Sequence, residues 1–295
     1  MRVFVTGATG FIGSALVPDL IRAGHQVLGL ARSDAGARTL AAAGAVVHRG
    51  DLEDLESLRR GADQSDAVIH LAFNHDFSRY AARCEDDRNV IEALGEVLAG
   101  SARPLVVTSG VMIVGAAGRA CVESDPPASS KLIPRAASEE AAAAAAARGA
   151  RVAIVRLPQV HDTVKQGLVT VLIQLAREKG VSAYVGDGSN RWAAAHLSDT
   201  AQLYRLVLEK SQPGAVYHAV AEEGVPLRTI AETIGRGLNV PVVAVPPEQA
   251  ASHFGWFAAF AGYDQPASSA WTREQLGWHP TGPDLLSDLR QMRYS

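Results

Sequence analysis

Short apolar segments alternate with longer segments of helical periodicity through the first half of the chain. The apolar segments predict strands at 2–6, 27–30, 45–48, 67–71, 105–108 and 151–156. The segments between them predict helices at 14–23, 35–43, 55–62, 85–99 and 135–148. Strands that are apolar on both faces and separated by helices are typical of a parallel sheet covered on both sides. The predicted fold class is therefore α/β, with a doubly wound parallel sheet.

The alternation loosens after residue 156, where prolines, aromatic residues and polar loops become denser. One later apolar run, at 215–220, predicts a strand that returns to the main sheet. We therefore expect a main domain over 1–157, with 196–221 returning to it. Residues 158–195 and 222–295 are expected to form a smaller lobe over the C-terminal edge of the sheet.

The composition argues against several classes of function. The chain has 295 residues, of which 47% are hydrophobic and 20% charged, as in globular proteins with a sizeable core. A net charge of −3 without a long basic run argues against a nucleic-acid partner. No apolar run is long enough to span a membrane, and no apolar leader precedes the first strand. Cys84 and Cys121 do not form a metal-like pair and fit a reducing compartment, so we expect a cytoplasmic protein without a metal site.

A glycine-rich turn, Thr6-Gly7-Ala8-Thr9-Gly10-Phe11-Ile12-Gly13, joins the first strand to the first helix. In this context the first glycine permits a tight turn, the second lets a pyrophosphate approach the backbone, and the third lets the helix pack close to the sheet. The N-terminus of the helix then offers free N–H groups and a positive dipole to phosphates. The pattern predicts a Rossmann-type, dinucleotide-binding domain; a tight turn without a ligand is the alternative.

The end of the second strand bears on the choice of cofactor. Sites that prefer NAD usually place an acidic residue there to bind the ribose hydroxyls, whereas this chain has Arg32 and Ser33. A guanidinium can pair with a 2′-phosphate through two hydrogen bonds. We therefore expect NADP(H), with NAD(H) as the alternative if Asp34 binds the ribose and Arg32 is only solvated. Asp51 is expected either to hold the adenine edge or to cap the next helix.

The sequence resembles the extended short-chain dehydrogenase/reductase superfamily, in its NAD-dependent epimerase/dehydratase branch. The resemblance covers nearly the whole chain and rests first on the glycine turn and on Gly50-Asp51-Leu52, His70-Leu71-Ala72 and Val107-Thr108-Ser109. Later motifs are Arg156-Leu157-Pro158, Gly186-Asp187-Gly188 with His196 and Asp199, and Leu276-Gly277-Trp278-His279-Pro280. The cofactor contacts expected from the turn and from this resemblance are Gly7, Thr9, Gly10, Phe11, Ile12, Gly13, Arg32, Ser33, Asp51, Leu52, Leu71, Ala72, Phe73, Arg135 and Pro158.

In that superfamily a serine or threonine and a Tyr-x-x-x-Lys pair carry the chemistry, with the tyrosine as general acid or base. None of the six tyrosines here is followed by lysine four residues later. Counting back from Arg156 places Arg135 at the lysine position and Lys131 at the tyrosine position. A register shifted by four places Arg135 at the tyrosine and Glu139 at the lysine. The position of the catalytic serine falls on Gly110, and Ser109 is the nearest hydroxyl.

Besides Ser109, four side chains are candidates for the chemistry, and a purely structural role is the alternative for each of the four. Arg135 cannot give up a proton at neutral pH, but it can bind the ribose or polarise a carbonyl as a fixed positive charge. Lys131 could donate a proton if burial lowered its pKa. His75 and His161 follow the fourth and sixth strands, at the edge where ligands of open α/β sheets bind.

Aromatic residues of the smaller lobe are candidates for the substrate cleft. Trp192 is expected either to stack on a substrate or to close the lobe interface. The aromatic run 253–260 is expected either to line an apolar pocket or to pack in the core of the lobe.

The leading functional hypothesis is an NADP(H)-dependent oxidoreductase of the extended short-chain type, acting on a small carbonyl or alcohol. The alternatives are a sugar-nucleotide epimerase or dehydratase, and a sensor or scaffold that binds NADP(H) without turnover. The small side chains of the alanine tract 141–147 would also allow a homodimer through the helices 85–99 and 135–148, although the tract equally suits packing within its own chain.

Overall fold

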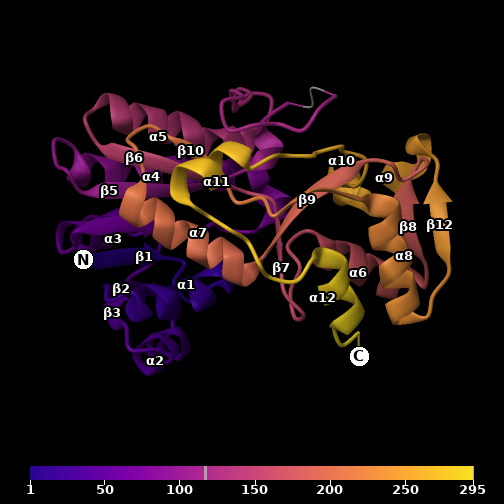
Figure 1. Cartoon of the computed structure of the whole chain (residues 1–295), viewed down its shortest axis with the longest axis horizontal. Helices are drawn as coiled ribbons and strands as arrows, with labels where there is room; N and C mark the ends of the chain where they lie inside the picture. The colour runs from indigo at the N-terminus through magenta and orange to yellow at the C-terminus, as the bar shows by residue number, and fades with distance from the viewer. Residues whose placement is uncertain (116–117, 295) are drawn as a thin grey trace.

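The computed structural model describes residues 1–115 and 118–294. Its centre is a seven-stranded sheet in the order β10-β6-β5-β4-β1-β2-β3, in which every neighbouring pair is parallel. The chain enters at β1 and builds outward to β2 and β3 (Figure 1). It then starts again on the other side of β1 with β4. In open α/β sheets the ligand crevice lies beyond the strand ends where the order reverses, which here means β1 and β4. The strands are β1 (Arg2–Thr6), β2 (Gln26–Ala31), β3 (Val46–Arg49), β4 (Ala67–His70), β5 (Pro104–Gly110), β6 (Arg151–Leu157) and β10 (Val216–His218).

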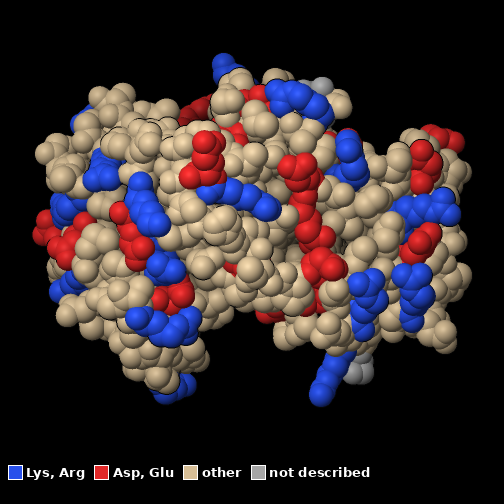
Figure 2. Space-filling view, in the orientation of Figure 1, with Lys and Arg blue, Asp and Glu red and all other residues tan. Residues whose placement is uncertain are grey.

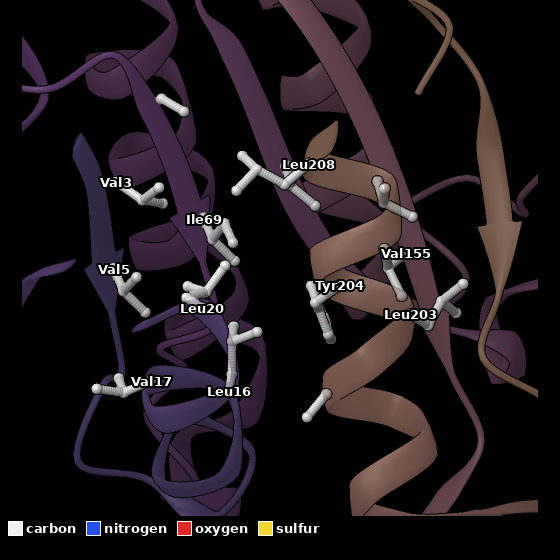
Figure 3. Close-up of a cluster of buried hydrophobic side chains, with 14 of the residues drawn as sticks. Val3, Val5, Leu16, Val17, Leu20, Ile69, Val155, Leu203, Tyr204 and Leu208 are labelled. Atoms are coloured by element: carbon white, nitrogen blue, oxygen red, sulfur yellow. The ribbon is translucent and has the colours of Figure 1, made fainter. Parts of the chain in front are cut away.

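Alternate residues of each strand enter different cores on the two faces of the sheet. Val3 and Val5 of β1 belong to a cluster with side chains of α1 (Phe11–Arg22) and α7 (Leu197–Lys210), as Figure 3 shows. Phe4, between them, belongs to a cluster with side chains of three other helices. Those helices are α3 (Leu55–Asp63), α4 (Tyr80–Leu98) and α5 (Ala137–Ala147), whereas α2 (Asp34–Ala42) packs on the first face through Leu40. The two buried faces explain why the strand segments are apolar throughout.

The alanine tract of α5 packs against α4 of the same chain. A Cβ built on Gly95 of α4 would lie 2.5 Å from the Cβ of Ala145, so the two helices approach closely only because both residues are small. The alanine tract therefore packs within its own chain, which is one of the two roles that the sequence analysis predicts. Association with a second subunit stays a prediction.

A smaller lobe lies beside the sheet (Figure 1). It holds its own core around Trp192, Ile230 and Phe257. One of its sheets has the order β11-β9-β7, and β12 pairs with β8 in a second. The strands are β7 (Gln159–His161), β8 (Ser182–Val185), β9 (Arg191–His196), β11 (Glu222–Pro226) and β12 (Val242–Val245). The helices are α6 (Val169–Lys179), α8 (Leu227–Leu238), α9 (Ala250–Phe254), α10 (Ala258–Ala261) and α12 (Leu285–Gln291), together with the short turn η5 (Gly255–Phe257).

The C-terminal segment joins the two parts. After α11 (Ala270–Leu276), Trp278 is fully buried in the core cluster of α1 and α7. The carboxylate of Asp199 then accepts the backbone N–H groups of Thr281 and Gly282, at 3.1 and 2.8 Å. The chain continues into α12, whose Leu285 and Leu289 lie in the core of the lobe. The predicted division between main domain and lobe stays a prediction, but residues of the 270–278 segment pack on the main sheet.

Most predicted elements agree with the structure to within a few residues, and two helices begin earlier. The first helix begins at Phe11 rather than at 14, and the fourth at Tyr80 rather than at 85, directly after the turn η1 (Phe77–Arg79). Among the described residues, no helix is long and apolar enough to cross a membrane, and no three or more His, Cys, Asp or Glu side chains are arranged so that they could hold a metal ion. On the face shown in Figure 2, basic and acidic side chains are intermixed.

Candidate cofactor and active site

The glycine turn after β1 has the geometry that a dinucleotide requires. Gly7 has a φ of +67°, and a Cβ built on it would lie 2.8 Å from the backbone nitrogen of Ala72. A Cβ on Gly13 would lie 2.2 Å from the carbonyl oxygen of Gly7, so only glycine lets α1 sit this close to the turn. The N-cap residue of α1, Gly10, offers no side chain to the helix, and no acidic residue lies in the first turn. The N–H groups at this helix end are therefore free for an anion such as a pyrophosphate.

Arg32 follows β2 and extends into solvent, with 83% of its side chain exposed. Its nearest carboxylate is that of Asp51, 3.7 Å from Nε. Asp34, the alternative ribose ligand, instead accepts a hydrogen bond of 2.7 Å from Arg49 of β3. The hydroxyl of Ser33 caps α2 by accepting the N–H of Gly36. The end of β2 thus presents one extended guanidinium, while the acidic residue beside it is paired elsewhere.

Asp51 does not cap the helix that follows it, so that alternative from the sequence is wrong. The cap of α3 is Asp54, whose carboxylate accepts the N–H of Ser57 at 2.9 Å. Asp51 accepts the N–H of Glu53 within a short turn, and Leu52 packs at the margin of the core below. This leaves the carboxylate of Asp51 beside Arg32, close to the expected adenosine end of the site.

A buried polar network runs beneath the crevice from β1 to α5. Thr6 Oγ1 lies 2.7 Å from Nδ1 of His70, and Nε2 of His70 lies 3.0 Å from Oδ1 of Asp87. Oδ2 of Asp87 accepts hydrogen bonds from Arg135 at 2.9 Å and from the hydroxyl of Ser138. Burial alone would raise the pKa of Asp87, but the positive charge of Arg135 and the hydrogen bonds from His70 and Ser138 lower it. The network therefore holds an ionised carboxylate inside the protein.

Arg135 is held in place at the end of β5. Besides its bond to Asp87, it donates to the carbonyl oxygen of Thr108 at 3.0 Å, and it contacts Ser138. Its guanidinium carbon lies 4.4 Å from the centre of the Phe73 ring, and 15% of its side chain remains exposed. Phe73 follows Leu71 and Ala72, whose backbone nitrogens bond to Thr6 at the end of β1. Arg135, Phe73 and the glycine turn are thus brought to one edge of the sheet.

The other candidates are placed less favourably for chemistry. Lys131 is exposed in the turn before α5, so it lacks the burial on which its proposed role as a proton donor depends. Ser109 is buried, and its hydroxyl has no hydrogen-bond partner among the described residues. A Cβ built on Gly110 would meet nothing nearer than the carbonyl oxygen of Leu157, at 3.7 Å. Pro158, half-buried, joins β6 to β7.

His75 lies near the crevice and His161 does not face it. His75 is exposed, but partial desolvation and then the positive charges of Lys165 and Arg135 lower its pKa, which favours the neutral ring at pH 7. His161 is fully buried, with Nδ1 2.7 Å from Asp288 of α12. The structure thus gives His161 the structural role that the sequence left as an alternative. Trp192 is buried too and donates to the carbonyl oxygen of Tyr263, so it closes the core of the lobe and cannot stack on a ligand.

An aromatic contact bridges the main domain and the lobe. The Phe77 ring, beyond β4, stacks on that of Trp256 in η5, with centroids 4.8 Å apart and an interplanar angle of 16°. Trp256 remains 53% exposed, which is unusual for so large an apolar side chain. Sequence patterns could not predict this pairing, because the two residues are far apart along the chain. Only the aromatic composition of 253–260 pointed to this part of the lobe.

Comparison with known proteins places the chain in a family. The model of the NAD dependent epimerase/dehydratase family matches residues 3–221. The chain is 47% identical to an uncharacterized protein of Schizosaccharomyces pombe, with 100% of both chains covered. It is 29% identical to a 2-alkyl-3-oxoalkanoate reductase of Stenotrophomonas maltophilia, over 82% of this chain and 77% of the relative.

Among solved structures, dTDP-glucose 4,6-dehydratase from Streptomyces venezuelae has the same fold, with a TM-score of 0.79 and 20% identity over 100% of this chain and 96% of that chain. The match to the family model covers most of the sequence and includes the glycine turn, β4 and α5. The chain therefore belongs to the NAD-dependent epimerase/dehydratase family.

Proposed function

We propose that the protein is an NADP(H)-dependent oxidoreductase that acts on a small carbonyl or alcohol. The observation that carries the proposal is the bare N-terminus of α1 behind the glycine turn, with the extended Arg32 at the adjacent strand end. The first suits a pyrophosphate and the second a 2′-phosphate. The similarity to a reductase supports this reaction class.

Arg135 is proposed to act as a fixed positive charge. Asp87 and the carbonyl oxygen of Thr108 hold its guanidinium at the edge of β5, beside Phe73. From there it would bind a ribose hydroxyl or stabilise negative charge on a substrate oxygen. When bound, the nicotinamide cofactor supplies or accepts the hydride.

His75 is proposed to exchange the proton with the substrate oxygen. Because its pKa is lowered, the neutral ring can accept a proton at pH 7, as alcohol oxidation requires. Ser109, with its unpaired hydroxyl, would be a hydrogen-bond donor near the same strand end. These roles take the place of the Tyr-x-x-x-Lys pair. No tyrosine of this sequence has a lysine four residues after it.

A second candidate function is that of a protein that binds NADP(H) without turnover. It is favoured by Gly110 at the expected serine position and by the exposure of Lys131 at the expected tyrosine position. A sugar-nucleotide epimerase or dehydratase remains the alternative that the family name suggests, although those reactions also depend on the tyrosine.

Binding and turnover separate these functions. NADPH and NADH are titrated by fluorescence against the wild type, Arg32→Ala and, as a control far from the crevice, Arg22→Ala. We expect Arg32→Ala to weaken NADPH binding by about tenfold to a hundredfold, in line with a charge-assisted hydrogen bond, and to leave NADH unchanged. Equal affinity of the wild type for both nucleotides would exclude the NADP(H) preference. Tight binding with no activity across a panel of carbonyls and alcohols would favour the non-catalytic function.

A further inference from the structure

A short loop of the lobe carries a lysine to the glycine turn of the main domain. The loop lies between β7 and α6, and Asp162 forms hydrogen bonds across it. The Asp162 carboxylate accepts the N–H groups of Val164 and Lys165, each at 2.7 Å, and its own N–H donates to the carbonyl oxygen of Lys165 at 2.9 Å. The backbone on both sides of Lys165 is therefore fixed by one residue.

The base of this loop is anchored in the lobe. The side chain of Gln166 is buried and donates to the carbonyl oxygen of Asp162 at 2.8 Å. The buried side chain of Gln159 accepts the N–H of Leu168 at 2.9 Å. Between them Gly167 has a φ of +50°. Because the loop backbone is tied down in this way, only the side chain of Lys165 has to become ordered when a ligand binds.

Lys165 reaches the residue at which α1 begins. Its Nζ lies 5.6 Å from the centre of the Phe11 ring, although Phe11 belongs to the main domain and Lys165 to the lobe. The lysine is exposed, and no carboxylate among the described residues forms a salt bridge with it. Its charge also helps to lower the pKa of His75, which follows β4. The ammonium thus stands by the crevice without a counter-ion from the chain.

We propose that Lys165 binds the pyrophosphate of the dinucleotide from the side opposite the glycine turn. The turn and the N-terminus of α1 provide backbone N–H groups but no charged side chain, so a doubly negative group there lacks a full positive charge. Lys165 supplies that charge from the lobe, so that the ligand is held by both parts of the protein. The inference rests on the proposed binding of a dinucleotide.

The test compares ligands with and without a pyrophosphate. NADPH and NADH carry it, whereas adenosine 2′-monophosphate keeps the 2′-phosphate and lacks the pyrophosphate. Dissociation constants are measured by calorimetry for the wild type, Lys165→Ala, Lys165→Arg and the control Lys179→Ala, which removes the same charge at the far end of α6. We expect Lys165→Ala to weaken both dinucleotides about tenfold or more, and adenosine 2′-monophosphate not at all. Lys165→Arg should keep most of the affinity, and Lys179→Ala should resemble the wild type.

Each outcome has a separate meaning. If the wild type binds and Lys165→Ala binds equally well, the inference is wrong while the proposed function stands. If Lys165→Ala lowers kcat but leaves the dissociation constants unchanged, Lys165 acts on the substrate instead, and the inference is again wrong. If the wild type binds neither dinucleotide, the proposed function itself fails. Because Lys165 is exposed, unfolding midpoints should match the wild type in all three variants and exclude misfolding as the cause.

Discussion

Asp87 of α4 and Arg135, just before α5, form a buried ion pair in which Nη1 lies 2.9 Å from Oδ2. The carboxylate also bonds to His70 at the end of β4, so this one pair ties two helices to the strands that border the crevice. Only 15% of the Arg135 side chain and 4% of the Asp87 side chain are exposed. The pair therefore connects the stability of the fold with the position of the proposed active-site cation.

Removing Arg135 should destabilise the protein because it leaves a buried carboxylate without its cation. We expect Arg135→Ala to lower the free energy of unfolding by about 3–5 kcal/mol, as measured by urea titration at pH 7. The double variant Asp87→Asn/Arg135→Gln should lose less unfolding free energy than the single variants Asp87→Asn and Arg135→Gln lose together. In the double variant neither charge is left buried without its partner. A loss below about 1 kcal/mol in Arg135→Ala would show that the pair is not desolvated as the structure implies.

The same pair should set part of the response to acid. The pKa of Asp87 is lowered in the folded protein, so its contribution is fully present above the unfolded value of about 3.9. That contribution is lost as the pH falls through the lowered folded value. In Arg135→Ala the cation that opposes the effect of burial on Asp87 is gone, so the pKa of Asp87 in the folded protein rises. The unfolding free energy should then begin to decline at a higher pH than in the wild type. Urea midpoints between pH 3 and 7 measure this shift, and parallel profiles for variant and wild type would contradict it.

The contact between Gly13 and the Gly7 carbonyl oxygen predicts a sharp difference between two glycines. Gly13→Ala puts a methyl group 2.2 Å from that oxygen, which the backbone can accommodate only by opening the turn. We expect a loss of about 1–3 kcal/mol in unfolding free energy and a loss of dinucleotide binding. Gly110→Ala is the matched control, since its methyl group meets only an oxygen at 3.7 Å. If both variants bind NADPH like the wild type, the turn is not the cofactor site.

The stack of Phe77 on Trp256 predicts an effect on substrate rather than on cofactor. Trp256→Ala removes the lobe's half of the contact that bridges the crevice, so we expect a several-fold rise in KM for a carbonyl substrate. NADPH affinity should stay unchanged, and unfolding free energy should fall by about 0.5–1.5 kcal/mol. Trp271→Ala is the control, because Trp271 stacks on Tyr217 of β10 instead; it should lower stability and leave KM alone. If Trp256→Ala changes the affinity for NADPH, the prediction is wrong, and the Phe77–Trp256 stack contributes to cofactor binding instead.

Local patterns in the sequence were enough to predict the sheet and the glycine turn. The strands are recognisable because residues such as Val3 and Phe4 enter cores on opposite faces, which makes the segment apolar throughout. The turn is recognisable because its glycines are required by close backbone contacts, within the turn itself for Gly13 and with Ala72 after the neighbouring strand β4 for Gly7. The sequence pattern predicts a later start for α1 than the structure shows, because Gly10, its N-cap, has no side chain that could signal the start of a helix.

The contacts that complete the site depend on tertiary structure and could not be predicted. Arg135 was identified as a candidate from its register, but its partner Asp87 lies on another helix, 48 residues away. His161 looks like a crevice residue in the sequence because it follows the sixth strand, and only the docking of α12 buries it against Asp288. Lys165 gave no signal, since nothing local indicates that its loop reaches Phe11.

The burial of Trp278 against α1 and α7 has a consequence for the order in which the protein is made. The main sheet has seven strands, and its edge strand β10 is separated from β6 by the segment that builds part of the lobe. A nascent chain that has emerged only as far as residue 215 has a sheet whose β6 edge is unpaired and a core without Trp278. Such an edge can pair with other chains. The main domain therefore completes its fold only after residues 270–278 have been made, and chains cut before Trp278 should be much less stable than the chain of 295 residues.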